Sequence, residues 1–177
     1  FLLAQFREKR AYPLIVDLFR AGGETCLNAW GGIITEDLAH ILASVSQGDD
    51  GLIKQLAENT AANEYVRNAA LEALLVLVAE GVKPREEVVA YLAGFFRGGT
   101  EREPHDFWDF LIQCSLDLYP EELKADIEQA FKDDLSDQSL VNLQDVKSTL
   151  AKGKEKVLAE LRENPHFRFV TDTIEEL

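Results

Sequence analysis

The chain has 177 residues, enough for one domain with a sizeable core, and 46% of them are apolar, an ordinary share for a globular protein. Asp and Glu total 32 against 18 Lys and Arg, which gives a formal net charge of −14. Such a charge repels a phosphate backbone and argues against a nucleic-acid-binding protein. The two cysteines cannot form a disulfide framework, and no apolar stretch is long enough to span a bilayer, so we expect a cytoplasmic protein without a membrane segment.

Helical periodicity runs through almost the whole chain, and proline and glycine mark most of the expected helix ends. Taken in order, the expected helices are the last turns of a helix at 1–6, whose beginning is missing, and then 12–20, 35–46, 51–58, 64–80, 84–96, 104–118, 120–132 and 142–162. Gly153 weakens the middle of the last one. We expect residues 1–163 to form one helical domain and 164–177 to form a C-terminal tail with a short extended pattern near Phe167 to Thr171.

The stretch 64–81 is the most apolar of these helices, and we expect the rest of the chain to be arranged around it. Asn63 suits the N-cap, and Gly81 can adopt a left-handed conformation at the C-terminal end. Between them almost no polar face remains, so the helix must be buried on several sides. A membrane span is the alternative, but Arg67 and Glu72 interrupt the apolar run.

An internal repeat connects the helices. In one pattern an aliphatic residue is followed, three and four positions later, by small or apolar residues. The residues three positions after the aliphatic one are Leu18, Leu56, Leu92 and Ala130, so the pattern recurs with spacings of 38, 36 and 38 residues. A second series between them includes Leu38 and Ile41, which recur as Leu71 and Leu74 after 33 residues. Helices of a type A and a type B therefore alternate with a period typical of paired-helix solenoids.

The run Tyr65-Val66-Arg67-x-Ala69-Ala70-Leu71-x-Ala73-Leu74 resembles a HEAT repeat. Most of the chain is also similar to a bacterial family of HEAT-like proteins catalogued only as a domain of unknown function. The runs that carry this similarity are Leu2 to Ile15, Thr35 to Leu38, Asn63 to Arg67 and Leu116 to Pro120. The resemblance implies an all-α, right-handed α-solenoid of about four helix pairs with an incomplete first pair, and it brings no catalytic residues.

The connections suggest where a partner binds. Those from A to B helices (21–34, 59–63, 97–103 and 133–141) are longer than the B-to-A turns, and in a stacked array all connections of one kind lie along one edge. We expect a protein partner to bind this edge through Trp30, Arg97, Arg102 and His105. The alternatives are that long loops simply cover apolar repeat ends and that Trp30 and Trp108 belong to the core. A further possibility is that the partner binds the B-helix surface, where Glu72, Asp109 and Gln113 would be exposed.

No pattern in the sequence points to a catalytic, metal or cofactor site. His40, His105 and His166 are scattered, and Cys114 lies in an apolar helix. Cys26 is the more plausible reactive thiol, although no activating base lies near it in sequence. Three acidic pairs stand where negative charge complements a helix N-terminus, which explains them without catalysis; they are Glu36 and Asp37, Glu86 and Glu87, and Glu121 and Glu122.

Together these features predict a non-enzymatic module for protein–protein interaction with an acidic surface. An enzyme-like or chaperone-like role related to HEAT-repeat bilin lyases is the alternative, and it would need a pocket that joins Cys26 to a histidine or aspartate. A DNA-binding HEAT protein is a third class, which the net charge opposes.

We expect no measurable binding to duplex DNA at physiological salt, because a chain with a net charge of −14 gains nothing from the counterions that binding would release. A fluorescence-anisotropy titration measures this. A micromolar complex that weakens with added salt would contradict the expectation.

Overall fold

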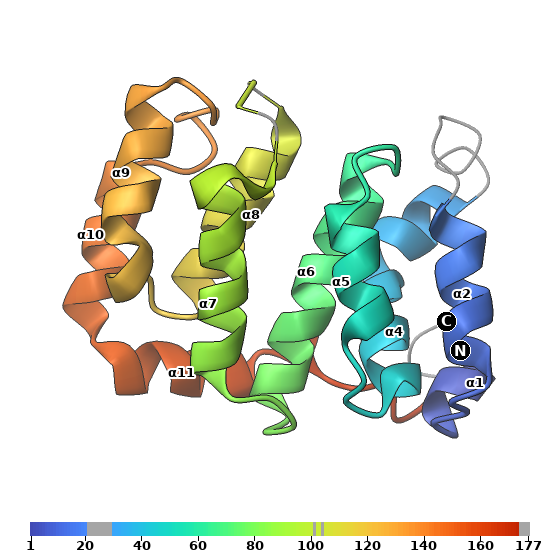
Figure 1. Cartoon of the computed structure of the whole chain (residues 1–177). Helices are drawn as coiled ribbons and strands as arrows, with labels where there is room; N and C mark the ends of the chain where they lie inside the picture. The colour runs from blue at the N-terminus through green and yellow to red at the C-terminus, as the bar shows by residue number, and fades with distance from the viewer. Residues whose placement is uncertain (21–29, 101, 104, 174–177) are drawn as a thin grey trace. The chain divides into compact units, whose positions relative to one another are not determined.

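The computed structural model describes residues 1–20, 30–100, 102–103 and 105–173, which are helical with short connections and contain no strand (Figure 1). This confirms the all-α prediction. The elements are α1 (Leu2–Gln5), α2 (Ala11–Arg20), η1 (Ile33–Asp37), α4 (Leu38–Ser46), α5 (Gly51–Glu58), α6 (Glu64–Ala79), α7 (Arg85–Gly94), η2 (Phe95–Gly99), α8 (Asp106–Asp117), η3 (Glu121–Leu123), α9 (Lys124–Lys132), α10 (Leu143–Lys152), α11 (Lys154–Glu163) and η4 (Pro165–Phe167). In the part of the chain that the structure describes, no helix is both long and apolar enough to cross a bilayer.

Two expectations about the C-terminal part need correction or refinement. The helix expected over 142–162 is two helices, α10 and α11, because Gly153 has φ +85° and ψ 149°, which ends one helix and redirects the chain before the next. In the tail, where an extended pattern is expected near Phe167 to Thr171, the structure has a 3₁₀ turn, Pro165–Phe167, followed over 168–173 by a chain without helix or strand.

The chain divides into two compact units. The first contains Phe1–Lys83 and Pro165–Leu177, and the second contains Pro84–Asn164. The change from the second unit back to the first falls between Asn164 and Pro165. The residues after it return to the first unit and cover part of its surface.

In the first unit α4 and α6 pack against each other, α2 contacts both α4 and α5, and α5 packs on α6. The helices of type A, α2 and α5, are therefore neighbours, and so are the helices of type B, α4 and α6. Neighbours of this kind are what stacked helix pairs produce.

Helix α6 is the centre of the first unit, as the sequence predicts. Eleven of its 16 residues are buried. The Asn63 side chain accepts a hydrogen bond from the backbone N–H of Tyr65 at 2.9 Å, and Gly81 follows the helix with φ +70°. Both helix ends are thus formed by the residues whose chemistry suits them.

The second unit is held together by aromatic side chains. Helix α7 contacts α8 and η3, α9 contacts η2 and η3, and α8 contacts α11. The rings of Phe95 and Phe107 lie 5.4 Å apart, and those of Phe96 and Trp108 lie 5.9 Å apart, within the range of favourable ring pairs. Trp108 is fully buried, so it belongs to the core.

Replacing Leu74 by alanine in the middle of α6 should lower the free energy of unfolding by about 2–5 kcal/mol, because it removes a fully buried side chain and leaves a cavity. Chemical denaturation measures the change. Leu14→Ala in α2 is the matched control, since that side chain is 70% exposed and its loss should matter little. A loss below about 0.5 kcal/mol for Leu74→Ala would refute the central position of α6.

Candidate functional site

The B-helix face of the first unit is defined here by Gln5 on α1, His40 and Ser44 on α4, and Glu72 and Glu80 on and just after α6. The C-terminal segment 165–173 crosses this face. Its first turn, η4, contacts α6. Segment and face are far apart in sequence, so their meeting is a tertiary feature of the fold.

Side-chain oxygens on the face accept hydrogen bonds from the backbone of the segment. The N–H of Phe169 donates to Glu80 Oε1 at 3.0 Å, and the N–H of Val170 donates to Ser44 Oγ at 3.0 Å. Further along, Gln5 Oε1 accepts from the N–H of Thr173 at 3.2 Å and from its hydroxyl at 2.6 Å. Three of these four bonds go to main-chain groups, which every residue except proline offers.

Two apolar side chains anchor the segment, while residues beside them are more open to solvent. Phe167 is 5% exposed and Val170 is 1% exposed. Arg168, Thr171 and Asp172 are exposed. The Arg7 guanidinium lies 3.9 Å from the centroid of the Phe169 ring, a cation–π contact. The face therefore distinguishes buried anchor positions from exposed spacer positions.

A histidine pair completes the contact. The rings of His40 and His166 meet edge to face with centroids 5.5 Å apart, and His166 Nε2 lies 3.7 Å from Glu72 Oε2. His40 is buried in α4. In the part of the chain that the structure describes, no group of three His, Cys, Asp or Glu side chains is placed to hold a metal ion.

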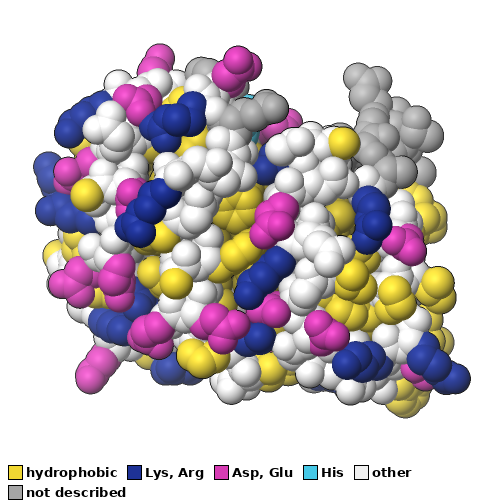
Figure 2. All heavy atoms as spheres, in the orientation of Figure 1, with side chains coloured by type: hydrophobic (Ala, Val, Ile, Leu, Met, Phe, Trp, Pro, Cys, Tyr) yellow, Lys and Arg dark blue, Asp and Glu magenta, His cyan; other side chains and the backbone are white. Residues whose placement is uncertain are grey.

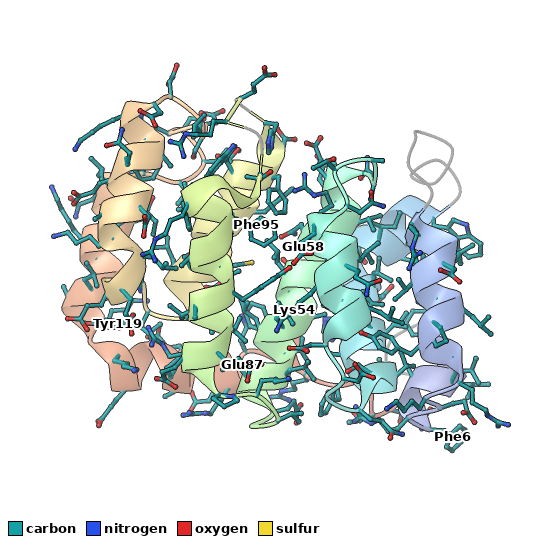
Figure 3. The ribbon with its side chains drawn as sticks, in the orientation of Figure 1. Phe6, Lys54, Glu58, Glu87, Phe95 and Tyr119 are labelled. Carbon is teal, nitrogen blue, oxygen red and sulfur yellow. The ribbon has the colours of Figure 1, made fainter. Side chains whose placement is uncertain are left out.

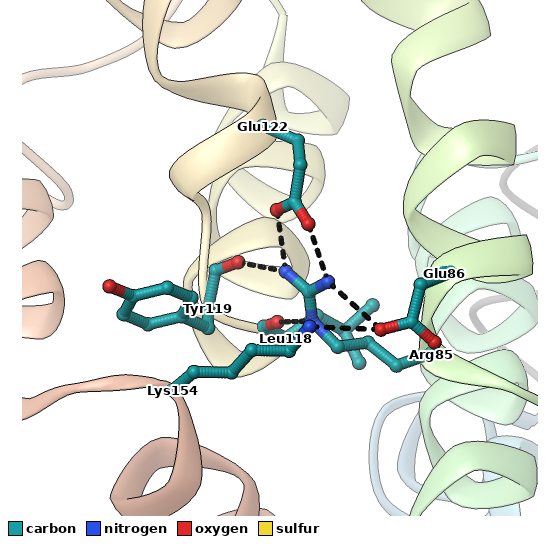
Figure 4. Close-up of polar contacts among 6 residues, drawn as sticks. All are labelled: Arg85, Glu86, Leu118, Tyr119, Glu122 and Lys154. Carbon is teal, nitrogen blue, oxygen red and sulfur yellow. Dashed lines mark hydrogen bonds and ion pairs between the residues drawn. The ribbon is translucent and has the colours of Figure 1, made fainter.

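The second unit contains a buried arginine that the sequence does not single out (Figure 4). Both terminal nitrogens of Arg85 donate to the Glu122 carboxylate, at 2.8 and 2.7 Å, and the guanidinium also donates to the backbone carbonyls of Leu118 and Tyr119. Lys154 donates to Glu86 at 2.9 Å beside this pair. The cluster connects the start of α7 to the turn that precedes η3. Its charged groups bind one another, so we assign it a role in stabilising the fold.

The hydrogen bonds from Arg85 lower the pKa of Glu122 from its ordinary value of 4.5 to about 2. A signal for this pair exists in the sequence. Arg85 follows Pro84 and Glu122 follows Pro120 by two residues, so both stand at the start of an A-type helix, where the repeat places them at the same end of the unit.

The four residues expected to bind a partner lie in different units: Trp30 in the first, and Arg97, Arg102 and His105 in the second. Trp30 is 42% exposed, so it is not a core residue. The structure brings Arg102 and His105 together against Trp108, with the guanidinium carbon of Arg102 5.7 Å from the ring centroid.

Both of these arginines have carboxylate partners in the second unit. Arg97 donates to Asp126 at 2.8 Å, and Arg102 donates to Asp133 and to the carbonyl of Phe96. The positive charge expected on the A-to-B edge is therefore partly neutralised. Whether these residues bind a partner stays a prediction.

Three further expectations can be compared with the structure. Asp109 is not exposed on a helical face: it is 9% exposed and accepts hydrogen bonds from Ser136 Oγ at 2.6 Å and from the N–H of Asp137 at 2.8 Å. It anchors the connection after α9, which sequence periodicity cannot reveal. Cys114 is buried, as expected, and Cys26 lies outside the described residues.

The difference in loop length is smaller than expected. The connection between α5 and α6 covers 59–63 and that between α6 and α7 covers 80–84, so an A-to-B loop and a B-to-A turn have the same length. The longest expected loop falls largely on residues 21–29, which lie outside the described part of the chain.

Fold and site define an all-helical protein of packed helices in which a segment without helix or strand, 168–173, lies across one helical face. The chain belongs to the family described as protein of unknown function (DUF1186), whose model matches residues 1–177. An uncharacterized protein of Chlamydia trachomatis serovar D is 36% identical over 178 residues, and one of Chlamydia muridarum is 35% identical over 178 residues. In both cases the match covers 100% of this chain and 70% of the relative. No solved structure matches the chain.

Glu122→Gln should lower the free energy of unfolding by about 1–2 kcal/mol near pH 7, a value reduced for the partial exposure of the carboxylate. Because folding lowers the pKa of Glu122 from 4.5 to about 2, its stabilising contribution is complete above pH 4.5 and is lost as the pH falls toward 2. Urea denaturation measures the free energy of unfolding of the unaltered chain and of Glu122→Gln, and the difference between these two values should shrink as the pH falls over this range. Glu121→Gln, on the same turn, is the control, and an equal effect of both substitutions would contradict the role of the pair.

Proposed function

We propose that this protein is a non-enzymatic protein-interaction module, built as a HEAT-like, right-handed α-solenoid of about four helix pairs, that binds an extended polypeptide segment. The sequence period and the pairing of like helices within the first unit support the solenoid. A cytoplasmic location is part of the same proposal.

The observation that carries the proposal is the way in which the B-helix face holds residues 167–173. Acceptors from α1, α4 and the end of α6 bind main-chain N–H groups, and two positions three residues apart take apolar side chains. Main-chain hydrogen bonds give affinity for any extended chain, and anchor positions give selectivity, which is how peptide-binding surfaces divide these tasks.

The buried serine on α4 supports this view. Ser44 is 1% exposed, in a helix whose residues are all buried, where packing alone favours an apolar residue. Its hydroxyl accepts the N–H of Val170, so the serine places a hydrogen-bond acceptor under a polypeptide backbone.

Charge and exposed apolar groups are compatible with a protein partner. The net charge of −14 makes the protein acidic overall, while Figure 2 shows both signs of charge interspersed on one face. Large apolar side chains are exposed on and next to α1 and α2, and Phe6 points outward in Figure 3. These exposed apolar side chains are Leu2, Leu3, Phe6, Leu14 and Leu18.

Partner contacts by Trp30 in the first unit, and by Arg97, Arg102 and His105 in the second, remain part of the proposal, each within its own unit. The exposed indole of Trp30 offers apolar contact area, and an acidic partner segment could take Arg97 and Arg102 over from Asp126 and Asp133. For the alternative related to bilin lyases, Cys26 lies outside the described residues, and no observation favours it.

A labelled ten-residue peptide with the sequence of residues 164–173 tests the proposal. The titrated protein is the full chain with Phe167→Ala and Val170→Asp, two changes that remove the anchors of its own segment. We expect saturable binding by fluorescence anisotropy, and at least tenfold weaker binding of a control peptide with aspartate at both anchor positions, because a charge is costly to bury. Equal binding of the two peptides would contradict recognition by the anchor positions.

A further inference from the structure

We propose that segment 165–173 is a built-in competitor of the partner, and that the partner presents the same pattern: an aromatic anchor, a spacer, a second aromatic residue and an aliphatic anchor on an extended backbone. The proposal rests on the proposed function, because it names the occupant and the regulation of the same B-helix face.

The contacts of the segment give the chemistry of the partner position by position. The place of Phe167 is buried and takes an aromatic ring, and the place of Val170 is buried and takes an aliphatic side chain. Between them, the ring of Phe169 lies under the Arg7 guanidinium, which favours an aromatic residue there. His166 lies beside Glu72, so a histidine or a cation suits the position before the first anchor.

The main-chain contacts require a segment of polypeptide whose N–H groups are not used within a helix. Acceptors on the face meet the N–H groups of residues 169, 170 and 173. These bonds do not depend on the identity of the side chains, so another chain with the same anchors can form them. A partner that replaces the segment can therefore recover each of these three main-chain hydrogen bonds.

The segment is also built to be exchanged. It has two anchors, and the side chains of Arg168, Thr171 and Asp172 are exposed. The N–H of Phe169 bonds to Glu80 at an exposed position. A non-helical segment on the surface opens locally at lower free energy than helices packed in a core, such as α6.

Competition predicts a specific difference in affinity. In the unaltered chain the segment occupies the face for most of the time, so the apparent affinity for an added peptide is reduced by the small fraction of open molecules. We expect the 164–173 peptide to bind the unaltered chain at least tenfold more weakly than the chain with Phe167→Ala and Val170→Asp.

Two controls keep the comparison informative if the double substitution disturbs folding. Circular dichroism and thermal denaturation show whether the variant retains its helices. A full-length chain with a protease site inserted between Asn164 and Pro165, both positions being exposed, is cleaved after it has folded. The labelled peptide should then displace the native segment from the cleaved protein, whereas the peptide with aspartate anchors should not.

The outcomes separate the two proposals. Equal binding to the unaltered and the altered chain would overturn competition by the segment, while binding to a peptide would stand. If neither the altered chain nor the cleaved chain binds the peptide, the proposed function fails, and the inference fails with it. Dimers that exchange their segments, detected by light scattering of the unaltered chain, would make a second copy the occupant and overturn the assignment to a separate partner.

Discussion

Burial of α6 on most of its sides is the constraint on which the first unit depends. Its apolar residues pack against α4 and α5, and what remains is a narrow polar stripe at Asn68, Glu72 and Glu80, spaced by four and eight residues. The segment meets this stripe through Glu72 and Glu80. Helix α6 thus contributes both to the core of the first unit and to the B-helix face. Its apolar residues pack in the core, and its polar stripe binds segment 165–173.

At the short turns, polar side chains join one turn to another. There, polar side chains of one turn bind the main chain or a side chain of another: Gln47 donates to the carbonyl of Arg7 at 2.6 Å, and Lys83 lies 3.1 Å from Asp50. Arg85 does the same for the carbonyls of Leu118 and Tyr119 in the second unit. Groups used in this way hold neighbouring helices of one unit together.

Much of the fold could be predicted because it depends on local signals. Periodicity gives the helices, Asn63 and Gly81 give the ends of α6, and the absence of a polar face gives its burial. Gly153 was visible as a weak point, but only its observed φ of +85° shows that it separates two helices. Long-range partners were not predictable: Asp109 is buried because Ser136 and Asp137 reach it from 27 and 28 residues away. Of the B-helix surface that the sequence offers as an alternative, only Glu72 belongs to the B-helix face, and its occupant is not predictable because no period in the chain links residue 170 to Ser44.

The energetics of the segment explain why it can act as a replaceable occupant. Burying its two anchors contributes roughly 1.5–3 kcal/mol each, and its hydrogen bonds to the face contribute about 1 kcal/mol each. Ordering the backbone of residues 167–173 costs about 1–2 kcal/mol per residue. These opposing terms are of similar size. A partner that offers the same anchors on a backbone already restricted to the bound conformation loses less conformational entropy on binding, which offsets part of the advantage that the tethered segment has as a part of the same chain.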